Sequence, residues 1–126
     1  MRAAIAEIDL AALRHNLSLA KSRAPRSRVV AVVKADAYGH GLTRVISALD
    51  AADAFGVACS EEAMTLRAAG VTKPILLLEG CFEAAELDLC RQHGFWAVVH
   101  HVSQVEMLER SPGPPVPVWL KIDTGM

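Results

Sequence analysis

The chain has 126 residues and a mass of 13.5 kDa, which is at most one domain's length. Hydrophobic residues make up 52% of it, enough to form a core, and the formal net charge of −1 argues against a nucleic-acid or anionic-membrane partner. No apolar run approaches the roughly 18 residues of a membrane helix, and Glu7 and Asp9 interrupt the stretch where a signal peptide would be apolar.

The cysteine content indicates the compartment. The three cysteines, Cys59, Cys81 and Cys90, are odd in number and have no C-x-x-C spacing. Both observations argue against a disulfide framework and a metal site. Reduced thiols are typical of cytoplasmic proteins, so we expect a cytoplasmic protein.

Short apolar runs rich in Val, Ile and Leu recur along the chain and predict five strands, at residues 29–33, 54–58, 74–78, 95–99 and 116–122. Segments with helical periodicity lie between them. The first helix is predicted to follow Asp9 as its N-cap. Its apolar face is formed by Leu10, Leu13, Leu17 and Ala20.

Four further helices are predicted from their end signals. One follows Gly41, one opens at Ser60 and stops at Gly70, and one runs over about 83–93 before Gly94. The last opens at Ser103, with Glu106 at the spacing of a capping box. Repeated strand–helix units predict an α/β fold with a parallel sheet, but periodicity alone does not separate a doubly wound sheet from a barrel.

The run at 31–41, AVVKADAYGHG, carries the main chemical signal. Lys34 ends an apolar, β-branched run, and an ammonium is unusual in a buried strand unless something uses it. Lysine forms imines with pyridoxal phosphate, and barrel enzymes place their chemistry at strand ends. The alternative is a strand-end lysine whose ammonium simply reaches water.

This run resembles the pyridoxal-phosphate lysine motif of alanine racemases. The last residues, LKIDTGM at 120–126, resemble a second motif of that family. The resemblance implies an eight-stranded α/β barrel followed by a β domain. A complete barrel needs about 250 residues, whereas five strands are predicted here. We therefore expect residues 1–126 to form the N-terminal portion of the cofactor-binding barrel, a partial TIM-like (β/α) barrel without the C-terminal β domain.

The resemblance assigns roles to three residues toward pyridoxal 5'-phosphate. Lys34 matches the lysine that holds the cofactor and exchanges the α-proton of alanine. Tyr38, the only tyrosine, matches a residue whose hydroxyl reaches the cofactor phosphate; the alternative is an aromatic that covers a turn. Leu78 matches a position beside the cofactor ring, although any strand leucine would look the same. His40 receives no acid–base role, and Asp36 replaces an asparagine common in the family.

Lys121 is predicted to be a second lysine in a buried strand. In the racemase family the matching lysine is often carbamylated, and the resulting anion orients a downstream arginine. The rival interpretation is an inward lysine paired with a carboxylate such as Asp123.

The neighbouring His100 and His101 do not predict a metal site, because adjacent strand residues point to opposite faces. Trp96 and Trp119 are interpreted as core or barrel-lining aromatics.

The function implied by the resemblance is alanine racemisation, which supplies D-alanine for the cell wall or serves alanine catabolism. The amino-acid sequences of residues 54–66 and 77–82 most resemble those of the catabolic branch of the family. The second base of the family is a tyrosine of the partner subunit, which implies a homodimer. The alternatives are a broader-specificity amino-acid racemase and a non-catalytic barrel protein that carries the cofactor. For the 126-residue chain alone we expect oligomers or aggregates and no activity.

Overall fold

The computed structural model describes residues 3–126, in which helices and strands alternate. The helices are α1 (Leu10–Arg23), α2 (Lys34–Tyr38), α3 (Leu42–Val45), α4 (Ser60–Ala68), α5 (Ala84–His93) and α6 (Val102–Arg110). The strands are β1 (Val30–Val32), β2 (Ala54–Val57), β3 (Ile75–Leu77), β4 (Phe95–Val99) and β5 (Val118–Leu120). All five predicted strands are confirmed, although four of them are shorter than expected.

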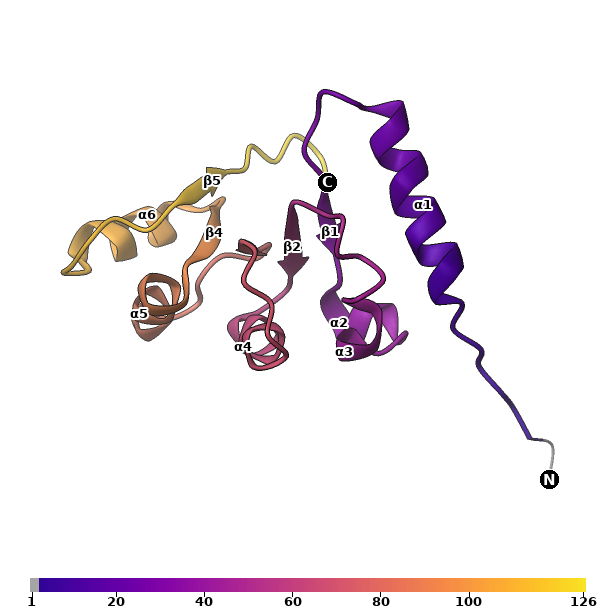
Figure 1. Ribbon diagram of the computed structural model, residues 1–126. Coiled ribbons are helices and arrows are strands. Elements are labelled where there is room, and N and C mark those ends of the chain that lie inside the picture. Colours follow the sequence, from indigo (N-terminus) through magenta and orange to yellow (C-terminus); the bar gives the residue numbers. More distant parts are fainter. Residues whose placement is uncertain (1–2) are drawn as a thin grey trace.

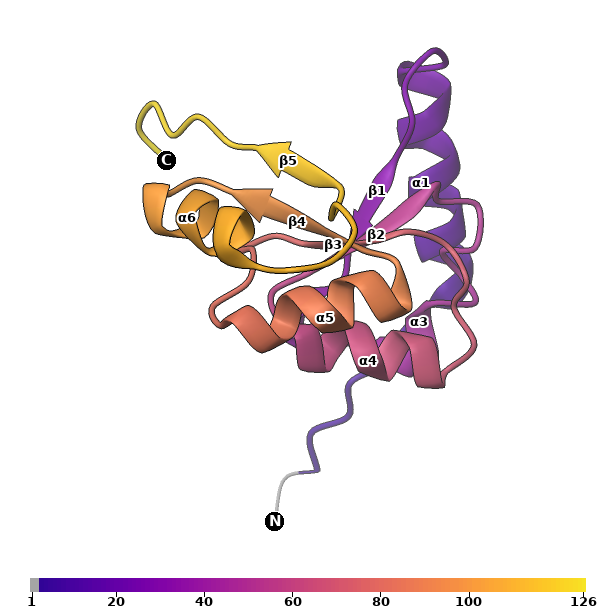
Figure 2. The same cartoon turned by 90° about the vertical axis from the view of Figure 1, so that its left-hand side faces the viewer.

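The strands form one parallel sheet in the order β1-β2-β3-β4-β5 (Figure 1). A doubly wound sheet reverses its strand order at a switch point, whereas a barrel adds each strand beside the previous one. The sequential order is therefore that of an α/β barrel, and the curved sheet is a partial barrel. Figure 2 shows α4 and α5 side by side beneath the strands.

The two faces of the sheet differ in what covers them. Phe55, Ile75 and Phe95 are in register on neighbouring strands and belong to the buried core with Leu66 of α4 and Leu87 of α5. Strand residues of the opposite parity form the inner face, which no helix covers in Figure 2. The outer, helix-covered face is thus the hydrophobic core of the molecule.

Several helix ends confirm the expected signals. Asp9 is the N-cap of α1, and its carboxylate accepts hydrogen bonds from the N–H groups of Ala11 (2.8 Å) and Ala12 (3.0 Å). Gly94 ends α5 in the left-handed conformation, which a glycine adopts without steric cost. Of the apolar face predicted for α1, Leu17 is buried, while Ala20 is exposed.

The predicted capping box of α6 is wrong. The helix begins at Val102, and its N-cap is His101, whose ring nitrogen accepts a hydrogen bond from the Ser103 N–H at 3.2 Å. Glu106 instead forms an ion pair with Arg110, at 3.3 Å between Oε2 and an Nη atom. The ring nitrogen of His101, the residue directly before the helix, therefore caps α6 in place of the Ser103 hydroxyl that the spacing suggested.

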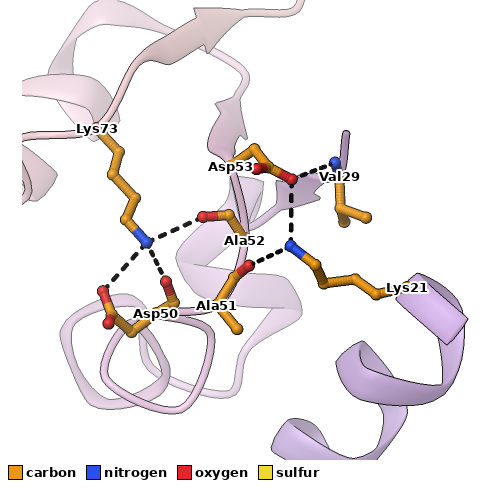
Figure 3. Close-up of polar contacts among 7 residues, drawn as sticks. All are labelled: Lys21, Val29, Asp50, Ala51, Ala52, Asp53 and Lys73. Atoms are coloured by element: carbon orange, nitrogen blue, oxygen red, sulfur yellow. Dashed lines mark hydrogen bonds and ion pairs between the residues drawn. The ribbon is translucent and has the colours of Figure 1, made fainter. Parts of the chain in front are cut away.

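Lysine side chains tie the loops before the strands together (Figure 3). The Lys21 ammonium of α1 donates to the Ala51 carbonyl at 2.8 Å and pairs with Asp53 at 3.3 Å, and Asp53 also accepts the Val29 N–H at 2.8 Å. Lys73 pairs with Asp50 at 3.2 Å. These contacts fix the entry of β1 and β2 and dock α1 beside the β1 edge.

Among residues 3–126 no helix is long and apolar enough to cross a membrane. The three cysteines form no disulfide; Cys81 Sγ and Cys90 Sγ lie 3.6 Å apart in the core, and Cys59 is half-buried.

Candidate functional site

The candidate site residues lie where the strands end. Backbone bonds extend the sheet beyond the strands, from Val33 N to the Gly56 carbonyl (2.8 Å), from Leu78 N to the Val57 carbonyl (2.8 Å) and from Lys121 N to the Val99 carbonyl (2.9 Å). Lys34, Leu78 and Lys121 therefore lie at the same edge of the sheet. In α/β barrels this carboxyl edge carries the active site.

Leu78 lies on the inner face of the sheet. The register continued by one residue places it opposite Ala58, and a Cβ added to Gly56 would lie 3.5 Å from Leu78 Cδ1. At β1 the chain leaves the extended conformation at Val33, where ψ is 22°, so Lys34 begins the next turn. The structure thus brings the predicted Lys34 and Leu78 to one edge of the sheet, with one strand between theirs.

Lys34 opens a left-handed turn. Ala35, Asp36, Ala37 and Tyr38 all have positive φ, between 51° and 56°. Left-handed conformation costs a residue other than glycine about 1–2 kcal/mol, so four in succession persist only where the surroundings impose them. Internal bonds include Ala37 N to the Val33 carbonyl (2.9 Å) and Gly39 N to the Ala35 carbonyl (3.0 Å). Sequence reasoning missed this turn.

Two carboxylates hold the ends of the left-handed turn. Glu62 of α4 accepts the Ala35 N–H at 2.7 Å and, through its other oxygen, the Ala58 N–H at 2.8 Å. Asp36 accepts the Leu42 N–H at 2.7 Å and so joins the turn to the start of α3. Neither role was predicted from the sequence.

The side chains of the turn differ in their surroundings. Lys34 is half-buried and, within residues 3–126, no carboxylate oxygen lies within 4.0 Å of its ammonium. Tyr38 is 60% exposed, so its hydroxyl is open to a ligand. His40 Nδ1 lies 2.8 Å from the Ala37 carbonyl, so this hydrogen bond explains the position of the ring without an acid–base role.

Lys121 does not lie in a buried strand, which corrects the expectation. β5 ends at Leu120, all three of its residues are exposed, and Lys121 is half-buried just beyond it. No ion pair joins Lys121 to Asp123 among the described residues, and the Asp123 carboxylate accepts the N–H groups of Gly125 (3.0 Å) and Met126 (2.9 Å). These two bonds, aided by the charge of Lys121, hold the pKa of Asp123 below its usual range. Lys121 follows the edge strand farthest from Lys34 in the sheet order.

The paired histidines act separately. His100 Nε2 lies 3.2 Å from the Glu79 carbonyl, whereas His101 caps α6. The described part of the chain contains no group of three or more side chains placed to hold a metal ion. Trp96 and Trp119 face each other on the inner side with ring centroids 5.8 Å apart, so they line the barrel rather than fill the helix-covered core.

A sequential parallel sheet defines part of an α/β barrel, and Lys34 places an amine without a carboxylate partner among the described residues at its carboxyl edge. The family comparison narrows this class. Residues 8–126 match the family model described as alanine racemase, N-terminal domain. The chain belongs to the alanine racemase family.

Curated relatives agree with this assignment. The chain is 57% identical to an alanine racemase of Chromohalobacter salexigens over 99% of its own length, and 58% identical to a catabolic alanine racemase of Pseudomonas aeruginosa over 100%. These alignments cover 35% and 36% of the relatives. The chain thus spans about a third of the length of the curated relatives that it matches.

Solved structures share the fold. A biosynthetic alanine racemase from Pseudomonas aeruginosa superposes with a TM-score of 0.88 at 50% identity, over 94% of this chain and 34% of that one. An alanine racemase from Bartonella henselae with covalently bound pyridoxal phosphate superposes with a TM-score of 0.72 at 32% identity, over 79% and 28%.

The residues present fit this cofactor. An aldehyde requires a primary amine that is not held by a carboxylate, and Lys34 offers one at the carboxyl edge. Leu78 supplies an apolar surface at the same edge of the sheet, and the exposed Tyr38 supplies a hydroxyl four residues from Lys34.

Proposed function

We propose that this chain is the N-terminal portion of a pyridoxal-phosphate-dependent alanine racemase that interconverts L-alanine and D-alanine. The observation that carries the proposal is the placement of Lys34, a lysine without a carboxylate partner at the carboxyl edge of a family-matched barrel. When bound, pyridoxal phosphate withdraws electrons from the α-carbon of an amino acid and makes its proton removable.

Lys34 has two tasks in this proposal. Its Nζ would hold the cofactor, and its amine would accept the α-proton on one face of the substrate. The same nitrogen returns a proton in the reverse direction. A base must lie within hydrogen-bond reach of the proton that it moves, so the direction of the Lys34 side chain decides the rate.

Tyr38 and Leu78 orient the cofactor. The Tyr38 hydroxyl is proposed to donate a hydrogen bond to the cofactor phosphate, and Leu78 to pack beside the ring. The base on the opposite face is proposed to be a tyrosine of a second subunit, so the full-length protein acts as a homodimer.

A broader-specificity amino-acid racemase is the second candidate. A histidine racemase from Leuconostoc mesenteroides superposes with a TM-score of 0.70 at 28% identity, so this fold also occurs in a racemase named for another amino acid. A non-catalytic cofactor carrier is disfavoured by the LKIDTGM motif, which such barrel proteins usually lack. Racemisation rates with alanine, serine and histidine, followed by circular dichroism, distinguish the two enzymes.

The test of the Lys34 assignment uses the full-length protein loaded with pyridoxal phosphate. Borohydride reduction should fix the cofactor on the peptide that contains Lys34, as read by mass spectrometry. Lys34→Ala should lose the absorbance of the covalently bound cofactor and lower the racemisation rate by at least about a thousandfold, while Lys73→Ala, at the opposite edge of the sheet, retains both. Recovery of the label on Lys121 would overturn the assignment.

A further inference from the structure

We propose that Glu62 is the positioning residue for Lys34. Its carboxylate holds the backbone directly after Lys34 against the end of β2 and so determines where the lysine side chain starts. The catalytic consequence of this inference rests on the proposed function, whereas the structural part does not.

The geometry singles out this carboxylate. Each of its oxygens serves a different strand end: Oε1 accepts the Ala35 N–H at 2.7 Å and Oε2 accepts the Ala58 N–H at 2.8 Å. Both bonds are short and charge-assisted, which makes them stronger than bonds between neutral groups. A single side chain of α4 thereby links the residue after Lys34 to the residue after β2.

The left-handed turn explains why such a link is needed. Ala37 N bonds to the Val33 carbonyl just before the turn and Gly39 N to the Ala35 carbonyl, whereas Ala35 N bonds only to Glu62. Asp36 anchors the far end of the turn through Leu42. Glu62 is therefore the side chain that ties the residue after Lys34 to the end of β2, and a change of φ at that residue would redirect the amine.

The chain offers a matched control in Glu86. Glu86 is the third residue of α5, as Glu62 is the third residue of α4. Its carboxylate also accepts backbone N–H groups, from Phe82 and from Glu83 (3.1 Å), and a hydroxyl from Ser60 at 2.6 Å. None of these partners belongs to the turn of Lys34, so Glu86→Gln reports the general cost of losing such a carboxylate.

The first experiment measures amide hydrogen exchange in the cofactor-free, full-length protein. Glu62→Gln should accelerate exchange at Ala35 and Ala58 by at least about tenfold, because loss of a hydrogen bond to a charged group is of that size. Glu86→Gln should accelerate exchange at Phe82 and Glu83 and leave Ala35 unchanged. Unaltered protection of Ala35 in Glu62→Gln would overturn the inference, whether or not the protein is a racemase.

The second experiment measures release of pyridoxal phosphate from the loaded protein and its absorbance against pH. Glu62→Gln should release the cofactor about tenfold faster and shift the absorbance profile, whereas Glu86→Gln lowers the melting temperature similarly without either change. Glu62→Asp keeps the charge with a shorter reach and should fall between Glu62→Gln and the wild type. Equal rates of cofactor release from Glu62→Gln and Glu86→Gln would show that Glu62 has only a structural role. If borohydride reduction of the wild type did not fix the cofactor on Lys34, the proposed function would be refuted instead.

Discussion

Carbamylation of Lys121 depends on a charge partner that the described chain does not place beside it. A lysine carbamate is an anion, and an unpaired anion that is removed from water costs several kcal/mol. The carboxylate of Asp123 lies near enough to Lys121 for their charges to interact, and it would repel the anion of a Lys121 carbamate. In the family, the partner of the carbamate is an arginine downstream of the motif.

We therefore predict that Lys121 is unmodified in the 126-residue chain and carbamylated, if at all, only in the complete protein. Carbon-13 NMR with labelled bicarbonate should detect no carbamate in the 126-residue chain. A carbamate signal that disappears in Lys121→Ala would contradict the prediction. An unmodified amine in both forms would favour a structural lysine.

Asp53 couples stability to pH at the strand entries shown in Figure 3. The Val29 N–H, together with Lys21, holds the pKa of Asp53 below its usual range. A lowered carboxylate pKa stabilises the fold above the unfolded value of about 3.9, and this stability is lost as the pH falls through the folded value. Asp53→Asn should therefore lower the melting temperature at pH 7, and the difference from wild type should shrink as the pH falls below about 3.9. A difference that does not shrink at low pH would show that charge is not the cause.

At the scale of elements, the left-handed turn α2 requires positive φ from residues other than glycine. Asp36 has φ of 53°, a region that asparagine tolerates, and its oxygen accepts the Leu42 N–H. Asp36→Asn preserves both features and should change stability by less than about 0.5 kcal/mol. Asp36→Val removes the acceptor and adds a β-branched side chain at positive φ, which should cost about 2–4 kcal/mol.

Denaturant unfolding of the two Asp36 variants measures this contrast. Racemisation rates should be unchanged in Asp36→Asn, as expected from the asparagine common in the family. If Asp36→Val were as stable as the wild type, the turn would not be left-handed in solution.

Strand and helix positions were predictable because local signals decide them. Asp9 caps α1 and Gly94 ends α5, as expected from residues that bond or turn in only a few ways. The cap of α6 was not predictable, since His101 is an uncommon N-cap and Ser103 offered a better signal two residues later. Four strands were predicted to be too long because the apolar runs continue beyond the residues that form the strands.

The chemistry of the site was predictable only in part. Lys34, Tyr38 and Leu78 were proposed through motif resemblance, and the structure places Lys34 and Leu78 at one edge of the sheet. The left-handed turn was missed because Ala-Asp-Ala-Tyr contains no glycine, the usual signal of positive φ. The role of Glu62 was missed because it depends on a contact between residues 27 positions apart.

At the scale of the whole molecule, the inner face and the two sheet edges favour association of the isolated chain. β1 and β5 each lack a neighbour on one side within the described sheet. Trp119 is 49% exposed and Leu120 is 74% exposed on the last strand. A hollow of about 470 Å³ on the inner side adds apolar surface; its lining is Arg28, Val30, Asp53, Ala54, Pro74, Trp96 and Trp119.

Unpaired strand edges and contiguous apolar surface promote contacts between chains. We predict that the 126-residue chain on its own forms oligomers or aggregates and shows no racemase activity. Light scattering over a range of concentrations tests this prediction, with the full-length protein as the control. A stable monomer at high concentration, or measurable racemisation by the isolated chain, would contradict it.

The order of the strands also has a consequence for how the protein is made. Each strand pairs with the one that precedes it in the chain, so every pairing from β1 to β5 can be completed as soon as its second strand has been synthesised. Parallel pairing has to wait for the intervening helix and is slow, but N-terminal regions fold first on the ribosome. The β1 and β5 edges are both unpaired in the described sheet, so both are open to strands of other nascent chains during synthesis.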